Sequence, residues 1–264
     1  MNLSKISALF ASAFAAALAL SPVPASALEA SYVIGTEGAY PPFNMVDADG
    51  KISGFDVDIG LALCAEMKVT CTVVAQDWDG IIPGLVAKKY DMIVASMFIT
   101  EERKQKVSFT DPYYKAAMTH VAKKGSGITD FTDAGMKGKN IGVQSATTQA
   151  SFAEKTYPSA SIKSYPTQDE VNLDMASGRL DLQIGDMLPM LDWVTKSKDG
   201  ADFELIGAPI TDPAFVGDGV GIAVRQSDNE LREAMNAAIK AIIANGTYKT
   251  INDKYFTIDV YTMK

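Results

Sequence analysis

MIVASMFITEERKQKVSFTDPYY, residues 92–114, is the stretch of sequence that decides the fold. It begins as a short apolar run, Met92–Val94, which indicates a buried strand, and it breaks at Ala95–Ser96. Thr100 predicts the start of a helix, because threonine is a good N-cap and two glutamates follow where the helix dipole favours acid. Arg103 breaks this rule. A solvated surface arginine is the simpler interpretation of this stretch alone, but such exceptions are expected at functional sites, and a forked cation here could receive a carboxylate.

Strands and helices alternate on both sides of this stretch. The first series has strands at 31–35, 70–75 and 91–96 and helices at 55–68 and 78–88. The second series has strands at 116–123, 141–144, 161–165 and 180–184 and helices at 147–157 and 169–177. Alternation of this kind predicts mostly parallel sheets. Because the pattern is repeated, we expect an α/β protein with two lobes.

The C-terminal part predicts a return and a long helix. A proline and three glycines mark 212–221 as a loop or a return crossing. An amphipathic helix follows at 227–245. Ser227 and Glu230 predict a capping box at its start, and Gly246 predicts its C-cap.

The first 27 residues have the features of a secretory signal peptide. Lys5 supplies the positive start, residues 6–20 are apolar, and Ala25-Ser26-Ala27 is a small-x-small cleavage site. We expect cleavage after Ala27 and export of the remaining chain. No cysteine stands directly after the cleavage site, so we expect no lipid anchor.

The composition is that of an ordinary globular protein, with 47% hydrophobic and 21% charged residues. The net charge of −8 argues against a nucleic-acid partner and mildly favours cationic ligands, although acidity more often serves solubility alone. An oxidising compartment favours a disulfide between Cys64 and Cys71. A metal pair is the weaker alternative, because His120 is the only histidine.

The sequence lacks the common motifs of catalysis. It contains no GxSxG, HExxH or CxxC. GMKGKN at 135–140 is interpreted as a turn, because the phosphate-loop spacing is wrong and no Ser or Thr follows the lysine. We expect His120 to be a structural or surface residue. The chain is therefore predicted to be no enzyme and to need neither metal nor cofactor.

Two segments have the character of a binding site. SATTQ at 145–149 lies between a predicted strand and helix, so Thr147, Thr148 and their backbone N–H groups could receive an anion. Simple N-capping by a threonine explains this segment equally well. Asp186 follows the strand at 180–184, at the carboxyl end where α/β sheets bind ligands, although by itself it would be taken for a loop aspartate.

Two aromatic side chains are predicted near strand ends as well. Tyr40 stands before Pro41 and Pro42, which indicate an extended loop, and Trp78 stands at the start of the second helix. Aromatic residues in such places usually cover a core. They also suit a slot for a flat or aliphatic ligand.

Seven motifs occur in register along the chain: GTEGAYPPF, GFDVDIGLALC, WDGIIPGL, ITEERKQKVSFTDPYY, GVQSATTQ, SGRLD and NGTYKTINDKYF. Together they resemble the periplasmic polar-amino-acid-binding proteins of ABC importers, of the lysine/arginine/ornithine and histidine type and including the opine binders. The resemblance covers essentially the whole chain after the signal peptide. It implies the two-lobed type II periplasmic binding protein fold, with two crossing strands between the lobes. Lobe 1 is expected at 28–115 and 214–264, and lobe 2 at 116–213.

The resemblance also implies how the ligand is held. Arg103 matches the arginine that forks onto the ligand α-carboxylate, with Thr148 beside it. Asp186 matches the aspartate that neutralises the α-ammonium, with Ser96 helping. Glu37 matches an acidic position at the distal polar end of the ligand. The full set implied is Glu37, Tyr40, Trp78, Ser96, Met97, Phe98, Arg103, Gln144, Thr148, Gln149 and Asp186, with Tyr40 and Trp78 sandwiching the ligand side chain.

Three further positions compare with the family in different ways. Cys64 and Cys71 match a disulfide seen there. Gln144 replaces a residue that is often apolar. Phe98 stands where many relatives carry a serine that contacts the ammonium group, which implies a smaller pocket or a ligand with a modified α-nitrogen, as in opines.

The resemblance implies a monomeric, non-enzymatic periplasmic binding protein. It would capture an amino acid, expected to be cationic, by closure of its lobes and deliver it to an ABC transporter permease. An opine ligand is the alternative within this class. A cyclohexadienyl or arogenate dehydratase on the same fold is an enzymatic alternative, and a sensor module is a third that no sequence feature favours.

Overall fold

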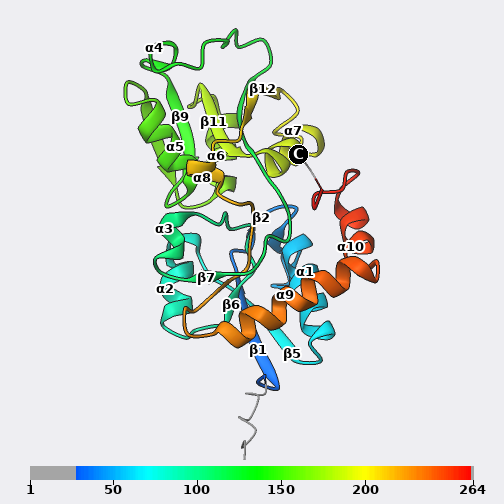
Figure 1. The fold of residues 1–264 in the computed structure, drawn as a ribbon. Helices are drawn as coiled ribbons and strands as arrows, with labels where there is room; N and C mark the ends of the chain where they lie inside the picture. The colour runs from blue at the N-terminus through cyan, green and yellow to red at the C-terminus, as the bar shows by residue number, and fades with distance from the viewer. Residues whose placement is uncertain (1–27, 263–264) are drawn as a thin grey trace, which may run out of the picture.

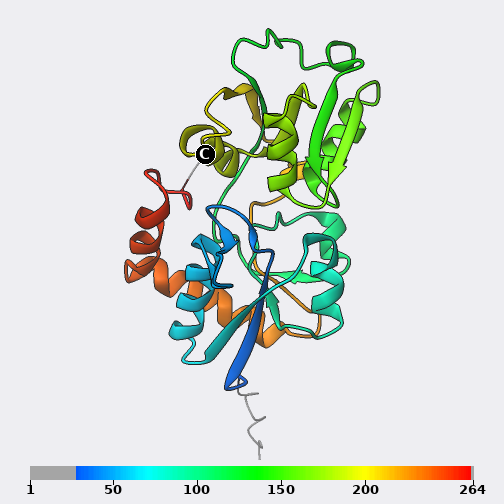
Figure 2. The same ribbon diagram turned by 180° about the vertical axis from the view of Figure 1, so that it is seen from behind.

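The computed structural model describes residues 28–262, which form two lobes placed one above the other in Figure 1. The predicted signal peptide, residues 1–27, and the last two residues of the chain lie outside this part. Figure 2 shows the same two lobes from behind. Among the helices of residues 28–262, none combines the length and apolar character needed to cross a membrane.

Lobe 1 is built on a five-stranded sheet with the order β5-β1-β6-β13-β7. Its strands are β1 (Ser31–Thr36), β5 (Thr70–Ala75), β6 (Met92–Ile93), β7 (Ser108–Phe109) and β13 (Ala223–Val224). β1 pairs in parallel with β5 and β6, as the alternating pattern predicts, whereas β13 is antiparallel to β6 and β7. A small sheet of β2 (Ala39–Tyr40), β3 (Asn44–Val46) and β4 (Ile52–Ser53) lies beside it.

The helices of lobe 1 are α1 (Phe55–Glu66), α2 (Ile81–Val86), α3 (Glu101–Lys104), α9 (Asn229–Ala244) and α10 (Thr247–Tyr255). A 3-10 turn, η1 (Trp78–Gly80), precedes α2. α1 packs against both α9 and α10, which cross the lower lobe in Figure 1. The C-terminal segment therefore completes the lobe that the N-terminal segment begins.

Lobe 2 has a sheet with the order β10-β9-β11-β8-β12. Its strands are β8 (Met118–Lys123), β9 (Asn140–Gln144), β10 (Ser161–Tyr165), β11 (Leu182–Asp186) and β12 (Phe203–Ile210). Its helices are α4 (Asp133–Met136), α5 (Thr148–Thr156), α6 (Gln168–Ala176) and α7 (Met187–Lys196), with α8 (Pro213–Val216) next to α5. β9 is parallel to β10 and β11, and β8 is antiparallel to β11 and β12.

Two segments of the chain join the lobes (Figure 1). One connects β7 to β8, and the other connects β12 to β13, which returns to the sheet of lobe 1. This arrangement confirms the predicted two-lobed α/β fold. The exact boundaries at 115/116 and 213/214 stay a prediction.

Two other sequence predictions have clear outcomes. The Cys64–Cys71 disulfide is confirmed and ties the end of α1 to β5. The capping box of Ser227 and Glu230 is wrong, because α9 begins one residue later and Ser227 Oγ donates to Asp228 Oδ1 (2.7 Å) instead of accepting from the helix. An ion pair between Arg225 Nε and Asp228 Oδ2 (2.7 Å) holds Asp228 in the turn before the helix.

Phe55, the first residue of α1, is the centre of the aromatic core of lobe 1. Its ring makes edge-to-face contacts with Phe43 and Phe256, at centroid distances of 5.7 and 5.2 Å. It also stacks on Tyr113 at 6.4 Å, and it is fully buried. These contacts join α1 to three other segments that are distant in sequence.

Replacement of Phe55 by alanine should therefore destabilise the whole lobe. We expect Phe55→Ala to lower the free energy of unfolding by about 3–5 kcal/mol, the usual cost of deleting a buried aromatic ring. Leu61→Ala on the same helix is the control, because Leu61 is 40% exposed and its loss should cost much less. Chemical denaturation followed by circular dichroism measures both, and similar losses would contradict this view of the core.

Candidate functional site

The ends of several strands and loops meet in the cleft between the lobes. The residues that line this cleft are Glu37, Tyr40, Trp78, Ser96, Phe98, Arg103, Gln144, Thr147, Thr148, Gln149 and Asp186. They leave a cavity of about 20 Å³ between them. Of the residues predicted from the sequence, Met97 alone does not line this cavity. It is buried in the core of lobe 1 and borders a neighbouring cavity.

Arg103 reaches the cleft from α3. Thr100 caps this helix as predicted, with its Oγ1 accepting from the Arg103 N–H (3.3 Å). The guanidinium lies 5.3 Å from the centroid of the Trp78 ring and donates from Nη1 to the Phe98 carbonyl (3.0 Å). Burial lowers the pKa of Arg103 to about 10, so the side chain stays cationic at neutral pH. An arginine has five N–H donors, so this one hydrogen bond leaves donors for a planar anion.

Asp186 is the last residue of β11, so the strand extends two residues further than predicted. Its buried carboxylate accepts from the Tyr40 hydroxyl of lobe 1 (2.8 Å) and from Gln149 Nε2 of lobe 2. Burial raises the pKa of Asp186 to about 7, and these hydrogen bonds and the charge of Arg103 offset only part of that rise. A cation placed beside the carboxylate would restore its ionised form.

Glu37 follows β1 directly and faces Gln144 of lobe 2. Gln144 Nε2 donates to Glu37 Oε1 (2.5 Å) and to the Pro166 carbonyl (3.0 Å). Burial, with smaller contributions from the nearby charges of Asp169, Asp77 and Asp79, raises the pKa of Glu37 to about 7. Within the described residues no Lys or Arg side chain forms an ion pair with Glu37. Its carboxylate is therefore a second place in the cleft where a cation would be favoured.

The two threonines before and in α5 have different roles. Thr147 is the N-cap, since its Oγ1 accepts from the Ala150 N–H (3.1 Å) and donates to the Gln144 carbonyl (2.6 Å). The capping interpretation of this segment therefore applies to Thr147. Thr148 begins the helix, and its hydroxyl lies on the cleft beside Gln149.

Two residues at the cleft have left-handed backbone conformations. Ser96 has φ 50° and Ala146 has φ 53°, a region that favours glycine and costs other residues free energy. The Ala146 carbonyl accepts from Trp78 Nε1 (3.1 Å), and next to it Ser145 Oγ donates to Asp79 Oδ1 (2.9 Å). These two hydrogen bonds join η1 of lobe 1 to the loop before α5 of lobe 2 at the rim of the cleft.

Asp56 is an important residue that the sequence did not reveal. It lies in the first turn of α1, where the helix dipole favours an acidic residue, and it is fully buried. It accepts hydrogen bonds from Asn44, Ser96 and Tyr113. No spacing in the sequence signals this arrangement, because the three donors come from different segments.

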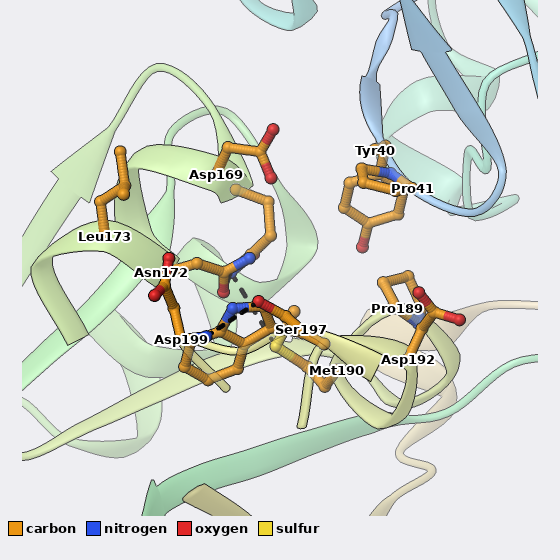
Figure 3. Close-up of a pocket in the computed structure, with 12 residues that line it drawn as sticks. Tyr40, Pro41, Asp169, Asn172, Leu173, Pro189, Met190, Asp192, Ser197 and Asp199 are labelled. Atoms are coloured by element: carbon orange, nitrogen blue, oxygen red, sulfur yellow. Dashed lines mark hydrogen bonds between the residues drawn. The ribbon is translucent and has the colours of Figure 1, made fainter. Parts of the chain in front are cut away.

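A separate cavity of about 350 Å³ is also lined by Tyr40 (Figure 3). Tyr40 and Pro41 of lobe 1 face α6 and α7 of lobe 2 across it. Its acidic side chains are Asp169, Asp192 and Asp199. Among residues 28–262, no group of three or more His, Cys, Asp and Glu side chains is arranged to hold a metal ion.

His120 has the structural role expected from the sequence. It is buried in lobe 2, where its Nε2 lies 2.9 Å from the Tyr157 hydroxyl and its ring packs against Phe131. Burial lowers the pKa of His120 to about 4. The residue is therefore neutral at physiological pH, and it does not line the cleft.

The chain is similar to several known proteins along most of its length. Residues 32–258 match the family described as bacterial extracellular solute-binding proteins, family 3. An L-arginine-binding protein of Pseudomonas aeruginosa is 45% identical, over 94% of this chain and 96% of the relative. A lysine/arginine/ornithine-binding periplasmic protein of Escherichia coli is 40% identical, over 89% and 91%. A solved structure of a Salmonella typhimurium periplasmic binding protein with high arginine specificity has a TM-score of 0.79 and 33% identity, and covers 87% of this chain and 100% of its own.

Proposed function

The chain belongs to the bacterial extracellular solute-binding proteins of family 3, and from this premise we propose that it binds a cationic amino acid between its lobes. The ligand class is L-arginine and similar basic amino acids. After export and cleavage behind Ala27, the protein would act as a monomer in the periplasm. There it would deliver its ligand to the permease of an ABC transporter.

The distribution of charge in the cleft carries this proposal. Arg103 offers donors for an α-carboxylate, and its guanidinium lies 5.3 Å from the centroid of the Trp78 ring. Asp186 offers a buried carboxylate for the α-ammonium. Glu37 is a second buried carboxylate without a cationic partner among the described residues, and it suits the distal guanidinium or ammonium of the ligand. One cation and two anions match an arginine or a lysine zwitterion.

Closure of the lobes would be coupled to binding through these same side chains. Tyr40–Asp186 and Glu37–Gln144 are hydrogen-bonded pairs with one member in each lobe. A cavity of about 20 Å³ holds no more than a water molecule, so a ligand must separate these pairs and take their place. A ligand that contacts both lobes favours the closed arrangement by its differential affinity.

The residues of this site give little support to the alternative that the protein is a dehydratase. A dehydratase requires an acid placed to expel a hydroxyl, and one that acts on a keto acid has no use for an ammonium counter-charge. Arg103 and Asp186 together instead provide for both charges of an amino acid. The two relatives and the solved structure compared above are binding proteins.

Arg103→Met should abolish tight binding of any α-carboxylate ligand. Breaking a desolvated, hydrogen-bonded charge pair on one side costs about 2–5 kcal/mol, so the Kd for L-arginine should rise more than tenfold in calorimetry. Arg179→Met is the control, because Arg179 is an exposed arginine of lobe 2 paired only with Asp174. Unchanged affinity in Arg103→Met would move the binding site elsewhere.

Ligand preference should depend on Glu37. An ionised carboxylate buried without a cation is costly, so arginine and lysine should stabilise the protein in a thermal-shift panel more than glutamate or leucine do. Glu37→Gln keeps the size of the side chain and removes its charge, and we expect it to weaken the preference for basic ligands. A panel led by acidic or apolar amino acids, or the same ranking in the variant, would contradict the assignment.

A further inference from the structure

Asp56 is a buried acidic residue directly beneath the cleft. Its Oδ2 accepts from Asn44 Nδ2 (2.9 Å) and from Ser96 Oγ (2.9 Å), and its Oδ1 accepts from the Tyr113 hydroxyl (2.5 Å). Three donors that converge on one carboxyl group favour its ionised, acceptor-only form. Burial raises the pKa of Asp56 to about 6, which leaves the group mostly ionised at neutral pH.

This contact determines what Ser96 can offer to a ligand. A hydroxyl has one hydrogen and two acceptor lone pairs. Because the hydrogen of Ser96 Oγ is directed at Asp56, the oxygen is left as an acceptor at a residue that lines the cleft. Ser96 is also held in its left-handed conformation by this contact and by the hydrogen bond from its N–H to the Tyr113 hydroxyl (3.3 Å).

The Asp56 carboxylate is also linked to the loop that carries Glu37 and Tyr40. Asn44, which donates to Asp56, accepts from the Gly38 N–H through its Oδ1 (2.7 Å). Gly38 lies between Glu37 and Tyr40, so the loop that carries both residues is tied to Asp56 through one side chain. Asp56 therefore does not line the cleft itself, but it accepts directly from Ser96, which does, and it is linked through Asn44 to the loop of Glu37 and Tyr40.

We propose that Asp56 is a positioning residue for ligand binding, which fixes the Ser96 hydroxyl oxygen as an acceptor for the α-ammonium of the ligand, next to Asp186. This inference rests on the proposed function. An ammonium group has three donors and no acceptor, so a hydroxyl whose own hydrogen is engaged elsewhere is complementary to it. Ser96 would thus supply a neutral contact for a cation whose charge Asp186 balances.

The test compares two probes that differ only in the α-ammonium: L-arginine and 5-guanidinopentanoate, which lacks it. Ser96→Ala should weaken binding of L-arginine by about tenfold, the loss expected for one hydrogen bond to a charged group, and leave 5-guanidinopentanoate nearly unaffected. Asp56→Asn should also reduce the discrimination, that is, the ratio of the affinity for L-arginine to the affinity for 5-guanidinopentanoate. In the Ser96→Ala background, Asp56→Asn should change this ratio little further. Asp58→Asn is the matched control, since Asp58 lies in the same turn of α1 but accepts from Lys254 and Tyr255 instead.

Discrimination that is unchanged in Ser96→Ala, or an Asp56→Asn effect that persists in full without the Ser96 hydroxyl, overturns the proposal. Ser96→Ala leaves Asp56 hydrogen-bonded to Asn44 and Tyr113, so we expect this variant to fold. If Asp56→Asn does not fold, the discrimination measured in Ser96→Ala still tests the proposal. A wild-type protein that binds neither probe contradicts the proposed function itself. Tight, discriminating wild-type binding with variants that match it contradicts only the role of Asp56.

Discussion

The burial of Asp186 between two lobes is the constraint on which the site depends. A carboxylate out of water needs either a cation or several hydrogen-bond donors. Asp186 receives donors from both sides of the cleft, Tyr40 from lobe 1 and Gln149 from lobe 2, with the Arg103 guanidinium in its field. Glu37 is satisfied in the same way elsewhere in the cleft, where it accepts a hydrogen bond from Gln144 of the other lobe. Polar groups that would hold a charged ligand thus satisfy one another across the lobes.

The fold brings these groups together because each stands at the end of a strand. Glu37 follows β1 and Asp186 ends β11, so each sheet directs one acidic side chain into the cleft. Ser96 in lobe 1 and Ala146 in lobe 2 have left-handed backbone conformations in loops of the site. Strained conformations of this kind persist where the surrounding contacts determine them, and here Asp56 and Trp78 supply such contacts.

The sequence alone predicted the features that depend on local pattern. Alternating strands and helices indicated both sheets, and Arg103 stood out because it opposed the helix dipole. Asp56 was missed because nothing in the local sequence separates this fully buried aspartate from Asp58, which lies two residues further along α1 and is only partly buried. The prediction of a capping box at Ser227 was wrong because Arg225 holds Asp228 in the turn before the helix. Helix-capping preferences do not take such an ion pair into account. The antiparallel strand β13 could not be foreseen either, since its two residues pair only with strands far away in sequence.

The central claim is that two buried carboxylates bind the cationic groups of a ligand. It can be tested directly by measuring the protons that are released on binding. Burial raises the pKa of Glu37 and of Asp186 to about 7, so both are partly protonated near neutral pH. A bound cation lowers these pKa values, and binding must then release protons. Calorimetric titration of L-arginine at pH 6.5, in buffers of different ionisation enthalpy, should show proton release that disappears at pH 8.5, where both groups are already ionised. Binding enthalpies that are independent of the buffer at pH 6.5 would contradict the claim.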